Sequence, residues 1–233
     1  MTLTLHPNFQ IKELYIGKEK TPLLVIDNFI EKADELVDIA EQLNFIQNPG
    51  FYPGLRVDAP QSYQDFFITQ LQQKLITYFG LSNPSLKFKM CQYSLVTQPA
   101  EQLSILQRIP HFDSVESTGL ACVHYLFKKD LGGTSFYRHR KTDFEFIDES
   151  RKIHYLKSLE SENKGGNIPK RVDGYIYGDT PLFEHIGEQK GVFNRLIIYR
   201  RNSLHSGSIA KNFVPDTNPR TGRLSINSFI DSV

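Results

Sequence analysis

The stretch "RIPHFDS", residues 108–114, places an imidazole and a carboxylate two positions apart, at His111 and Asp113. If this stretch is extended, both side chains project to the same face, because side chains in a strand alternate with a period of two. One nitrogen donor and one oxygen donor would then meet at one point, as in half of a metal site. The motif is short enough to occur by chance, so its context decides what it means.

A mononuclear non-heme iron site needs a second neutral imidazole beside one imidazole and one carboxylate. His205, in "NSLHSGS" after the apolar run "GVFNRLIIYRR", is the best placed of the remaining histidines. On the residues alone, a structural role and metal ligation both remain open for His205. The other histidines are terminal, lie within a strand pattern, or lie in or beside a polar segment: His6, His124, His139, His154 and His185. If His205 is not a ligand, His139 and His185 are the next candidates.

Composition and charge are those of an ordinary globular chain. Of the 233 residues, 39% are hydrophobic, 12% aromatic and 23% charged, which is too apolar for a disordered chain. The formal net charge of +1 provides no basic field, so neither nucleic acid nor a membrane surface is an expected partner. With no signal-like N-terminus and no apolar run of about 20 residues, we expect a cytoplasmic protein. Cys91 and Cys122 are too few for a disulfide framework or a thiolate zinc cage.

The residues that precede the motif have a largely helical pattern. After the apolar, strand-like run 22–30, apolar residues recur at helical spacing over 31–45. A second helix is predicted to end at Gly80, because glycine commonly terminates helices. From Lys87 onward the apolar runs shorten to strand length and are rich in β-branched and aromatic residues. Several short strands behind two helices predict a mostly β fold, a barrel or double-sheet sandwich, with helices on its flank.

The chain is long enough for one large domain, and we expect a single domain over 1–233. Residues 1–86 should form a helical flank with an edge strand, and residues 87–233 should form the β core. One segment, 138–190, is long, polar and charged and interrupts the strands. Such a segment is either a functional insert or a mobile loop.

Six short motifs follow one another in the second half of the chain. They are, in order, "CQYSL", "HFD", "CVHYLF", "GGTSF", "GVFNRLIIYRRNSLH" and "GRLSINSF". With these motifs the chain, from residue 22 to its end, resembles the prolyl-4-hydroxylase-like branch of the Fe(II)/2-oxoglutarate-dependent oxygenases. Six motifs in order are far more specific than any one of them. The resemblance implies a double-stranded β-helix, the cupin-like jelly roll, with Fe(II) held by His111, Asp113 and His205.

The resemblance also implies where the cosubstrate 2-oxoglutarate would bind. In that family a basic residue on the last strand pairs with the distal carboxylate of 2-oxoglutarate, and Arg223 occupies its position. A guanidinium suits this role because it grips a carboxylate through two hydrogen bonds. Tyr125 matches a tyrosine that reaches the same carboxylate, and Tyr93 matches an aromatic residue near the iron. Ser225 shares the face of Arg223 and joins the candidate cosubstrate site. The loop before this strand is longer than in the family, so Arg220 remains a second candidate for the carboxylate.

These assignments imply an oxygenase that hydroxylates an amino acid, a peptide or a related small metabolite and releases succinate and carbon dioxide. No catalytic residue is expected beyond the metal ligands, and ascorbate is the expected reductant in an assay. Tyr52 and Arg56, in "FYPGLR", are candidates for gripping a substrate carboxylate, with turn packing and an exposed arginine as the alternative. The segment 138–190 is expected to cover the iron site and to contact the substrate.

Two other classes of function remain open. A non-catalytic, cupin-like binding module would keep the barrel and the metal without turnover. A zinc hydrolase would use the same three ligands, since two histidines and a carboxylate also suit zinc. The arginine of the last strand has no evident role in a hydrolase. The substrate, the oxidised position and the oligomeric state do not follow from the sequence.

Overall fold

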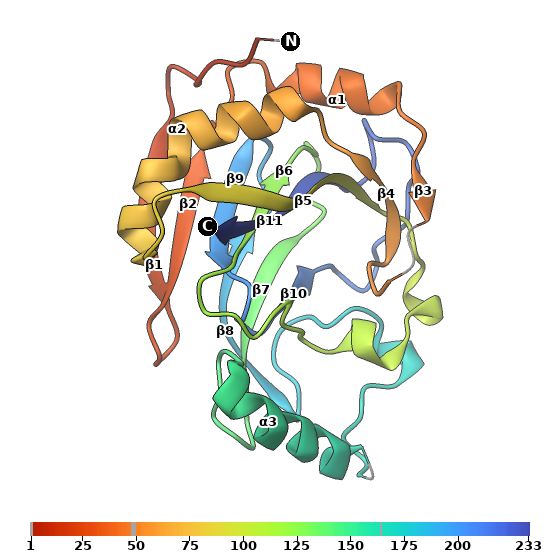
Figure 1. The fold of residues 1–233 in the computed structure, drawn as a ribbon. Helices are drawn as coiled ribbons and strands as arrows, with labels where there is room; N and C mark the ends of the chain where they lie inside the picture. The colour runs from red at the N-terminus through yellow and green to blue at the C-terminus, as the bar shows by residue number, and fades with distance from the viewer. Residues whose placement is uncertain (1, 48–49, 164) are drawn as a thin grey trace.

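The computed structural model describes residues 2–47, 50–163 and 165–233. Its strands form two antiparallel sheets (Figure 1). The larger sheet has eight strands in the order β1-β2-β9-β6-β11-β5-β4-β3, and the smaller sheet has three in the order β10-β7-β8. The fold is therefore mostly β, a jelly roll with flanking helices, as the sequence predicted.

The strands of the larger sheet are β1 Gln10–Ile16, β2 Thr21–Asp27, β3 Ile46–Gln47, β4 Gly54–Asp58, β5 Leu86–Val96, β6 Leu120–Tyr125, β9 Arg195–Arg200 and β11 Leu224–Ser232. Those of the smaller sheet are β7 Gly133–His139, β8 Phe183–Lys190 and β10 His205–Ser208. The α-helices are α1 Ala33–Glu41, α2 Gln61–Phe79 and α3 Glu149–Glu162, and short 3₁₀ turns lie at Ala100–Gln102, Ile105–Arg108 and Arg171–Asp173. None of the described helices combines the length and the hydropathy of a membrane-spanning segment.

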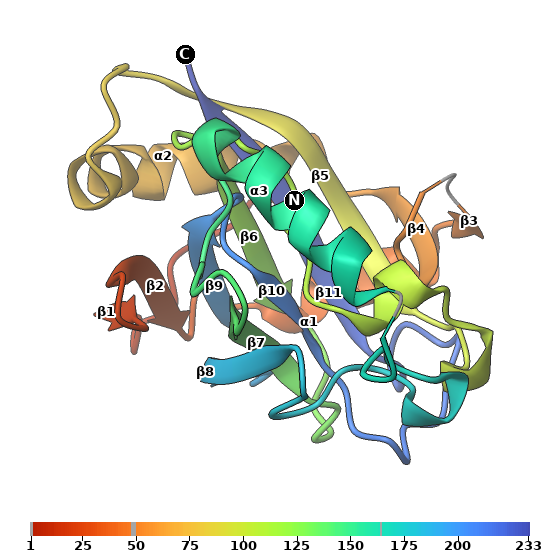
Figure 2. The same cartoon turned by 90° about the horizontal axis from the view of Figure 1, so that it is seen from below.

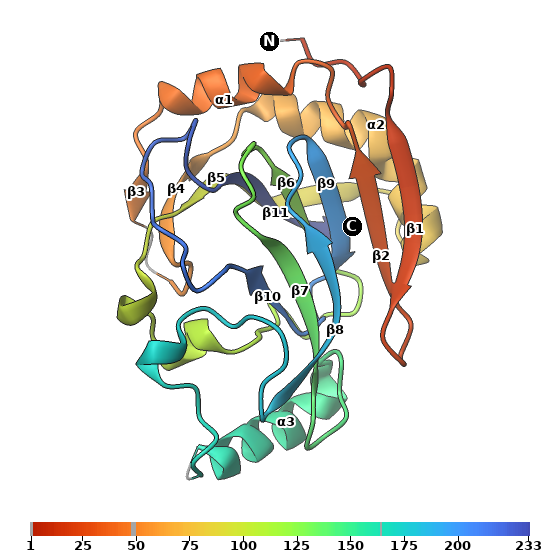
Figure 3. The same cartoon turned by 180° about the vertical axis from the view of Figure 1, so that it is seen from behind.

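Helices α1 and α2 cover the outer face of the larger sheet (Figures 1 and 3). On β2, Leu24 and Ile26 pack against these helices, whereas Leu23 and Val25 face the space between the sheets. Strand β9 is buried on both faces in the same way. Each fully buried aliphatic side chain stabilises the fold by about 1.5–3 kcal/mol, which explains why these strands are unbroken apolar runs in the sequence.

The N-terminal flank contains both predicted helices and more strand than expected. Gly80 ends α2 in the left-handed conformation, with φ of 59°, and its N–H donates to the carbonyl of Thr77 over 3.3 Å. Strands β1 to β4 of the flank all join the larger sheet. Strand β2 is therefore an interior strand, and β1 forms the edge.

The segment 138–190 contains regular structure, which corrects the prediction that it interrupts the strands. Its last eight residues form β8, which pairs along β7. Its middle forms α3, which was not predicted and which lies at the end of the molecule opposite α1 and α2 (Figures 1 and 2). Asp148 caps the N-terminus of α3, and its carboxylate accepts a hydrogen bond from the backbone N–H of Arg151 over 3.0 Å. Lys164 of this segment lies outside the described residues.

Candidate metal centre

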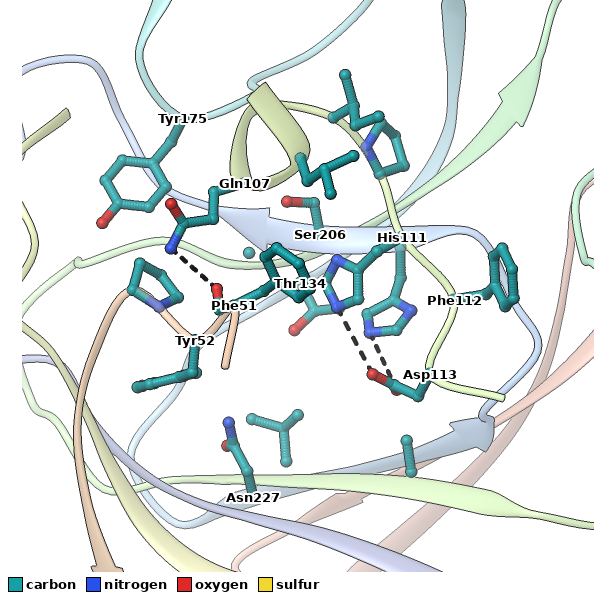
Figure 4. Close-up of a pocket in the computed structure, with 18 of the residues that line it drawn as sticks. Phe51, Tyr52, Gln107, His111, Phe112, Asp113, Thr134, Tyr175, Ser206 and Asn227 are labelled. Carbon is teal, nitrogen blue, oxygen red and sulfur yellow. Dashed lines mark hydrogen bonds and ion pairs between the residues drawn. The ribbon is translucent and has the colours of Figure 1, made fainter. Parts of the chain in front are cut away.

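The predicted metal ligands His111, Asp113 and His205 lie together in the wall of one pocket. His111 and His205 exchange two backbone hydrogen bonds of 2.9 Å, forming an isolated antiparallel bridge. The backbone N–H of Asp113 donates to the carbonyl of Arg201 over 2.8 Å, which fixes the strand-like segment beside the end of β9. The donor atoms of the three side chains all lie within 4.8 Å of one another (Figure 4). Within the described ranges no other group of three such side chains comes this close.

The carboxylate of Asp113 faces both imidazoles. Its oxygens lie 3.7 Å from Nε2 of His111 and 3.6 Å from Nε2 of His205. Nδ1 of His205 lies 2.9 Å from the carbonyl oxygen of Ser203 and must donate to it, because a carbonyl only accepts. This hydrogen bond leaves the Nε2 lone pair of His205 pointing at the shared space, which is the usual support for a metal-binding histidine.

His111 is held in its neutral form. Although 52% of its side-chain surface faces the open cavity, burial in the pocket wall lowers the pKa of His111 to about 4, and the neighbouring His205 adds to the effect. An imidazole must be unprotonated to bind a metal, so this environment suits ligation. Two imidazoles and one carboxylate on one face fit a non-heme Fe(II) centre, and the same donors also suit zinc.

The two histidines considered as substitutes for His205 have other partners. Nε2 of His139 pairs with Glu162 of α3 over 2.8 Å, and its Nδ1 contacts the hydroxyl of Thr142. Nε2 of His185 contacts the hydroxyl of Ser135 over 3.1 Å. Neither histidine lines the pocket that holds the three candidate ligands.

Arg223 lines this pocket, whereas Arg220 lies outside it. Nε and Nη2 of Arg223 donate to the carbonyls of Leu131 (2.9 Å) and Gly133 (2.7 Å), which anchors the guanidinium in the wall. Arg220 is on the surface, where its Nε donates to Glu41 over 3.0 Å and its Nη2 to Asp38 over 2.5 Å. In the long loop before β11, Arg220 is therefore bound to α1, and of these two arginines Arg223 is the one that can contact a ligand in the pocket.

Tyr125 and Ser225 each lie behind a pocket residue. The hydroxyl of Tyr125 shares a 2.8 Å hydrogen bond with Thr134, and burial raises the pKa of Tyr125 to about 12. The hydroxyl of Ser225 donates to the side-chain oxygen of Asn227 over 2.8 Å. Thr134 and Asn227 both line the pocket (Figure 4), so Tyr125 and Ser225 position the side chains that would touch a ligand.

The structure does not bring Tyr93 to the pocket, which corrects its predicted place beside the iron. Tyr93 is fully buried on the helix side of β5, and its hydroxyl donates to the carbonyl of Leu36 in α1 over 2.8 Å. Met90 and Val96, an odd number of positions away on the same strand, line the pocket instead. Alternation along a strand forces this outcome, because residues of opposite parity face opposite sides of the sheet.

The pocket encloses about 510 Å³ and has walls from several parts of the chain. Tyr52 and Arg56 line it, as do Tyr155 and Tyr175 of the segment predicted to cover the site. No pattern in the sequence indicated that the 3₁₀ turn before the motif would form a wall of the pocket. There Nε2 of Gln107 donates to the carbonyl of Phe51 over 2.9 Å and joins two loops at the rim (Figure 4).

Comparison with known proteins supports the fold and identifies a family. No curated protein matches the chain significantly. Among solved structures, HygX from Streptomyces hygroscopicus with nickel and 2-oxoglutarate bound has a TM-score of 0.53 at 13% identity, over 92% of this chain and 84% of that chain. The HygX complex with nickel, 2-oxoglutarate and hygromycin B has a TM-score of 0.51, and the iron complex 0.50, at the same identity and coverage. The likeness shows a shared fold. The family model of DUF6445, a family of unknown function, matches residues 7–230, and the chain belongs to this family.

Proposed function

We propose that the chain is an Fe(II)- and 2-oxoglutarate-dependent dioxygenase, most similar in its motifs to the prolyl-4-hydroxylase-like branch. Its reaction is the hydroxylation of an amino acid, a peptide or a related small metabolite, with release of succinate and carbon dioxide. The observation that carries this proposal is a two-histidine, one-carboxylate cluster in the same pocket as the anchored guanidinium of Arg223. The cluster would bind a metal and Arg223 would bind a dicarboxylate within one cavity.

His111, Asp113 and His205 are the residues that would hold the iron. Three protein donors on one face leave the remaining positions of a six-coordinate metal open. When bound, Fe(II) supplies the activation of dioxygen that is coupled to decarboxylation of 2-oxoglutarate. The chain supplies the neutral imidazole of His111, a fixed carboxylate and the hydrogen bond from His205 to Ser203 that orients the second imidazole ring.

Arg223 would bind the distal carboxylate of 2-oxoglutarate. Its Nε and Nη2 already hold two carbonyls, so the guanidinium is fixed before a ligand arrives and loses little freedom on binding. Thr134, supported by Tyr125, offers a hydroxyl to the same carboxylate. The fold shared with HygX, whose structure holds nickel and 2-oxoglutarate, supports this assignment.

Helix α3 would cover the substrate from the side of the smaller sheet. Tyr155, Leu156 and Leu159 of this helix line the pocket, and Leu156 is 47% exposed. An apolar cover that closes over a bound substrate would exclude water from the reacting atoms. The segment 138–190 is therefore proposed to provide much of the substrate specificity.

Formation of succinate tests the proposal against its alternatives. Purified protein with Fe(II), ascorbate, 2-oxoglutarate and dioxygen should form succinate slowly even without a substrate, and His205→Ala should form none. A binding module would bind metal without forming succinate. A zinc hydrolase would form none with iron and would gain hydrolytic activity with zinc, an outcome that the guanidinium of Arg223 in the pocket disfavours.

A further inference from the structure

Arg56 and Tyr52 line the pocket, and each has a buried polar atom without a hydrogen-bond partner within the described ranges. Arg56 lies on β4, and its guanidinium carbon stands 4.0 Å from the centre of the Tyr52 ring. Nε of Arg56 and the hydroxyl of Tyr52 are both buried and have no hydrogen-bond partner among the described residues. Ser94, which pairs with Arg56 across the ladder, donates its hydroxyl to Gln92 over 3.3 Å and not to Tyr52. The other polar contact of Arg56 is a weak one, from Nη1 to the sulfur of Met90 at 3.7 Å.

Arg56 has neither a carboxylate nor a carbonyl partner, which sets it apart from the other buried and partly buried arginines in the described part of the chain. Arg195 pairs with Asp27 over 2.6 Å, and Arg138 pairs with Glu184 over 2.6 Å. A guanidinium withdrawn from water is costly unless an anion or hydrogen-bond acceptors offset the loss. Burial also lowers the pKa of Arg56, and Asp113, which forms no ion pair with it, opposes only part of this shift. The molecule thus leaves a cation in the pocket wall without a counter-ion.

The charge of Arg56 would also remain without a counter-ion when Fe(II) and 2-oxoglutarate occupy the pocket. The described side chains that line the pocket and are charged at neutral pH are Arg56, Arg223 and Asp113. With Fe(II) and 2-oxoglutarate bound, Asp113 and the two carboxylates of the cosubstrate would offset the metal and Arg223. The charge of Arg56 would remain, so a substrate with a single negative charge would complete the balance.

Many of the other side chains that line the pocket are apolar. These apolar side chains come from the loop before β4, from β5 and β11, from the 3₁₀ turn before the motif and from α3. They are Phe51, Met90, Leu106, Leu156, Leu159 and Phe229. A ligand that follows this wall would bury apolar surface at about 25 cal/mol per Å². The body of the substrate should therefore be apolar.

We propose that Arg56 and Tyr52 form an anion subsite that holds the carboxylate of an amphipathic acid, with the apolar body of the acid lying along this wall. The guanidinium would grip the carboxylate through its two terminal nitrogens, and the Tyr52 hydroxyl would turn toward the carboxylate and donate to it. Figure 4 shows Tyr52 across the pocket from His111 and Asp113, so an acid held there reaches toward the metal ligands. This inference rests on the proposed function and names its substrate class, an apolar monocarboxylic acid.

Binding of one matched ligand pair tests the subsite. Protein loaded with Ni(II) and 2-oxoglutarate is titrated calorimetrically with 4-phenylbutyrate and with the uncharged 4-phenylbutyramide. The acid should bind more tightly than the amide. Arg56→Gln should weaken binding of the acid about 10- to 100-fold and leave binding of the amide unchanged, since a charged hydrogen bond contributes about 1.5–3 kcal/mol. Arg56→Lys should restore part of the loss, Tyr52→Phe should cause a smaller one, and the surface variant Arg220→Gln should cause none.

Three results would overturn the inference. They are equal binding of acid and amide, no binding of either, and an Arg56→Gln variant that loses affinity for 2-oxoglutarate instead of the acid. The last result would make Arg56 the cosubstrate anchor. If the wild-type protein binds neither Ni(II) nor 2-oxoglutarate, the proposed function fails separately. The same ligand pair on metal-free protein, with Arg223→Gln as the second variant, then tests the anion subsite by itself.

Discussion

Replacing Arg223 with alanine should weaken 2-oxoglutarate binding while leaving metal binding nearly unchanged. The guanidinium faces the cavity, and no described carboxylate pairs with it, so the cosubstrate would be its first anionic partner. Removing one member of a buried charge pair costs about 2–5 kcal/mol, because the other member stays buried without a partner. This loss corresponds to a rise in Kd of about 30- to 5000-fold. The metal ligands lie on β10 and in the segment before β6, away from Arg223 in the chain, so the affinity for the metal should change little.

The same substitution should also lower the free energy of unfolding, which can be measured separately from the affinity for 2-oxoglutarate. The carbonyls of Leu131 and Gly133 lose their donor when Arg223 is removed. Water entering the open cavity can replace the donor in part, so the free energy of unfolding should fall by about 1–3 kcal/mol. Arg223→Lys should keep the charge but lose the fork that holds two carbonyls and a carboxylate together, and it should fall between wild type and alanine.

Calorimetry of 2-oxoglutarate binding to Ni(II)-loaded protein measures the effect directly. Arg220→Ala is the matched control, because Arg220 contacts Asp38 and Glu41 on the surface and should leave the Kd unchanged. A large loss with Arg220→Ala and little with Arg223→Ala would refute the assignment of the cosubstrate carboxylate to β11. If Arg223→Ala lowered the affinity for the metal as much as the affinity for 2-oxoglutarate, the substitution would have damaged the whole site and not removed only the partner of the carboxylate.

Further predictions concern the ligands, the core and helix α3. His111→Ala, Asp113→Ala and His205→Ala should each abolish succinate formation and metal binding with little change in Tm, because these side chains line a cavity; retained activity in His205→Ala would refute the metal site. Burial lowers the pKa of His124 to about 4 in the folded protein. As the pH falls from about 6.5 to 4, His124 is therefore protonated in the unfolded chain but not in the folded one, and the free energy of unfolding should fall by up to about 3 kcal/mol. Chemical denaturation should show a flatter pH profile for His124→Gln, and an identical profile would contradict the argument. Hydrogen exchange in α3 should slow when 4-phenylbutyrate is added to protein loaded with Ni(II) and 2-oxoglutarate, whereas unchanged exchange in α3 with protection at β4 would exclude a cover.

The metal cluster could be predicted because strand geometry is regular. An extended segment brings residues two apart to one face, so His111 and Asp113 had to point the same way. The residues alone left a structural role open for His205, and its place among the ligands was implied by the family resemblance. The two-sided burial of β2 and β9 followed from their unbroken apolar runs. The same alternation should have excluded Tyr93, whose parity on β5 differs from that of the pocket residues Met90 and Val96.

Other parts of the site depend on contacts that no local pattern records. Arg220 and Arg223 are chemically alike, and only the ion pairs between Arg220 and α1 show that Arg220 lies outside the pocket. Helix α3 is mostly polar and buries only a narrow stripe around Tyr155, so its sequence resembles an exposed loop. Its one local signal is Asp148, a residue type favoured at the N-cap of a helix. The lack of a partner for Arg56 is visible only once every neighbouring strand is in place.

The central claim is that His111, Asp113 and His205 hold Fe(II) in a pocket that also binds 2-oxoglutarate. Anaerobic titration of the protein with Fe(II) and then 2-oxoglutarate tests it directly, through the visible absorption that a 2-oxo acid gives when it chelates Fe(II). The wild-type protein should develop this absorption to saturation, and Asp113→Ala should not develop it. Absence of the absorption in the wild-type protein, or its full retention in Asp113→Ala, would contradict the claim.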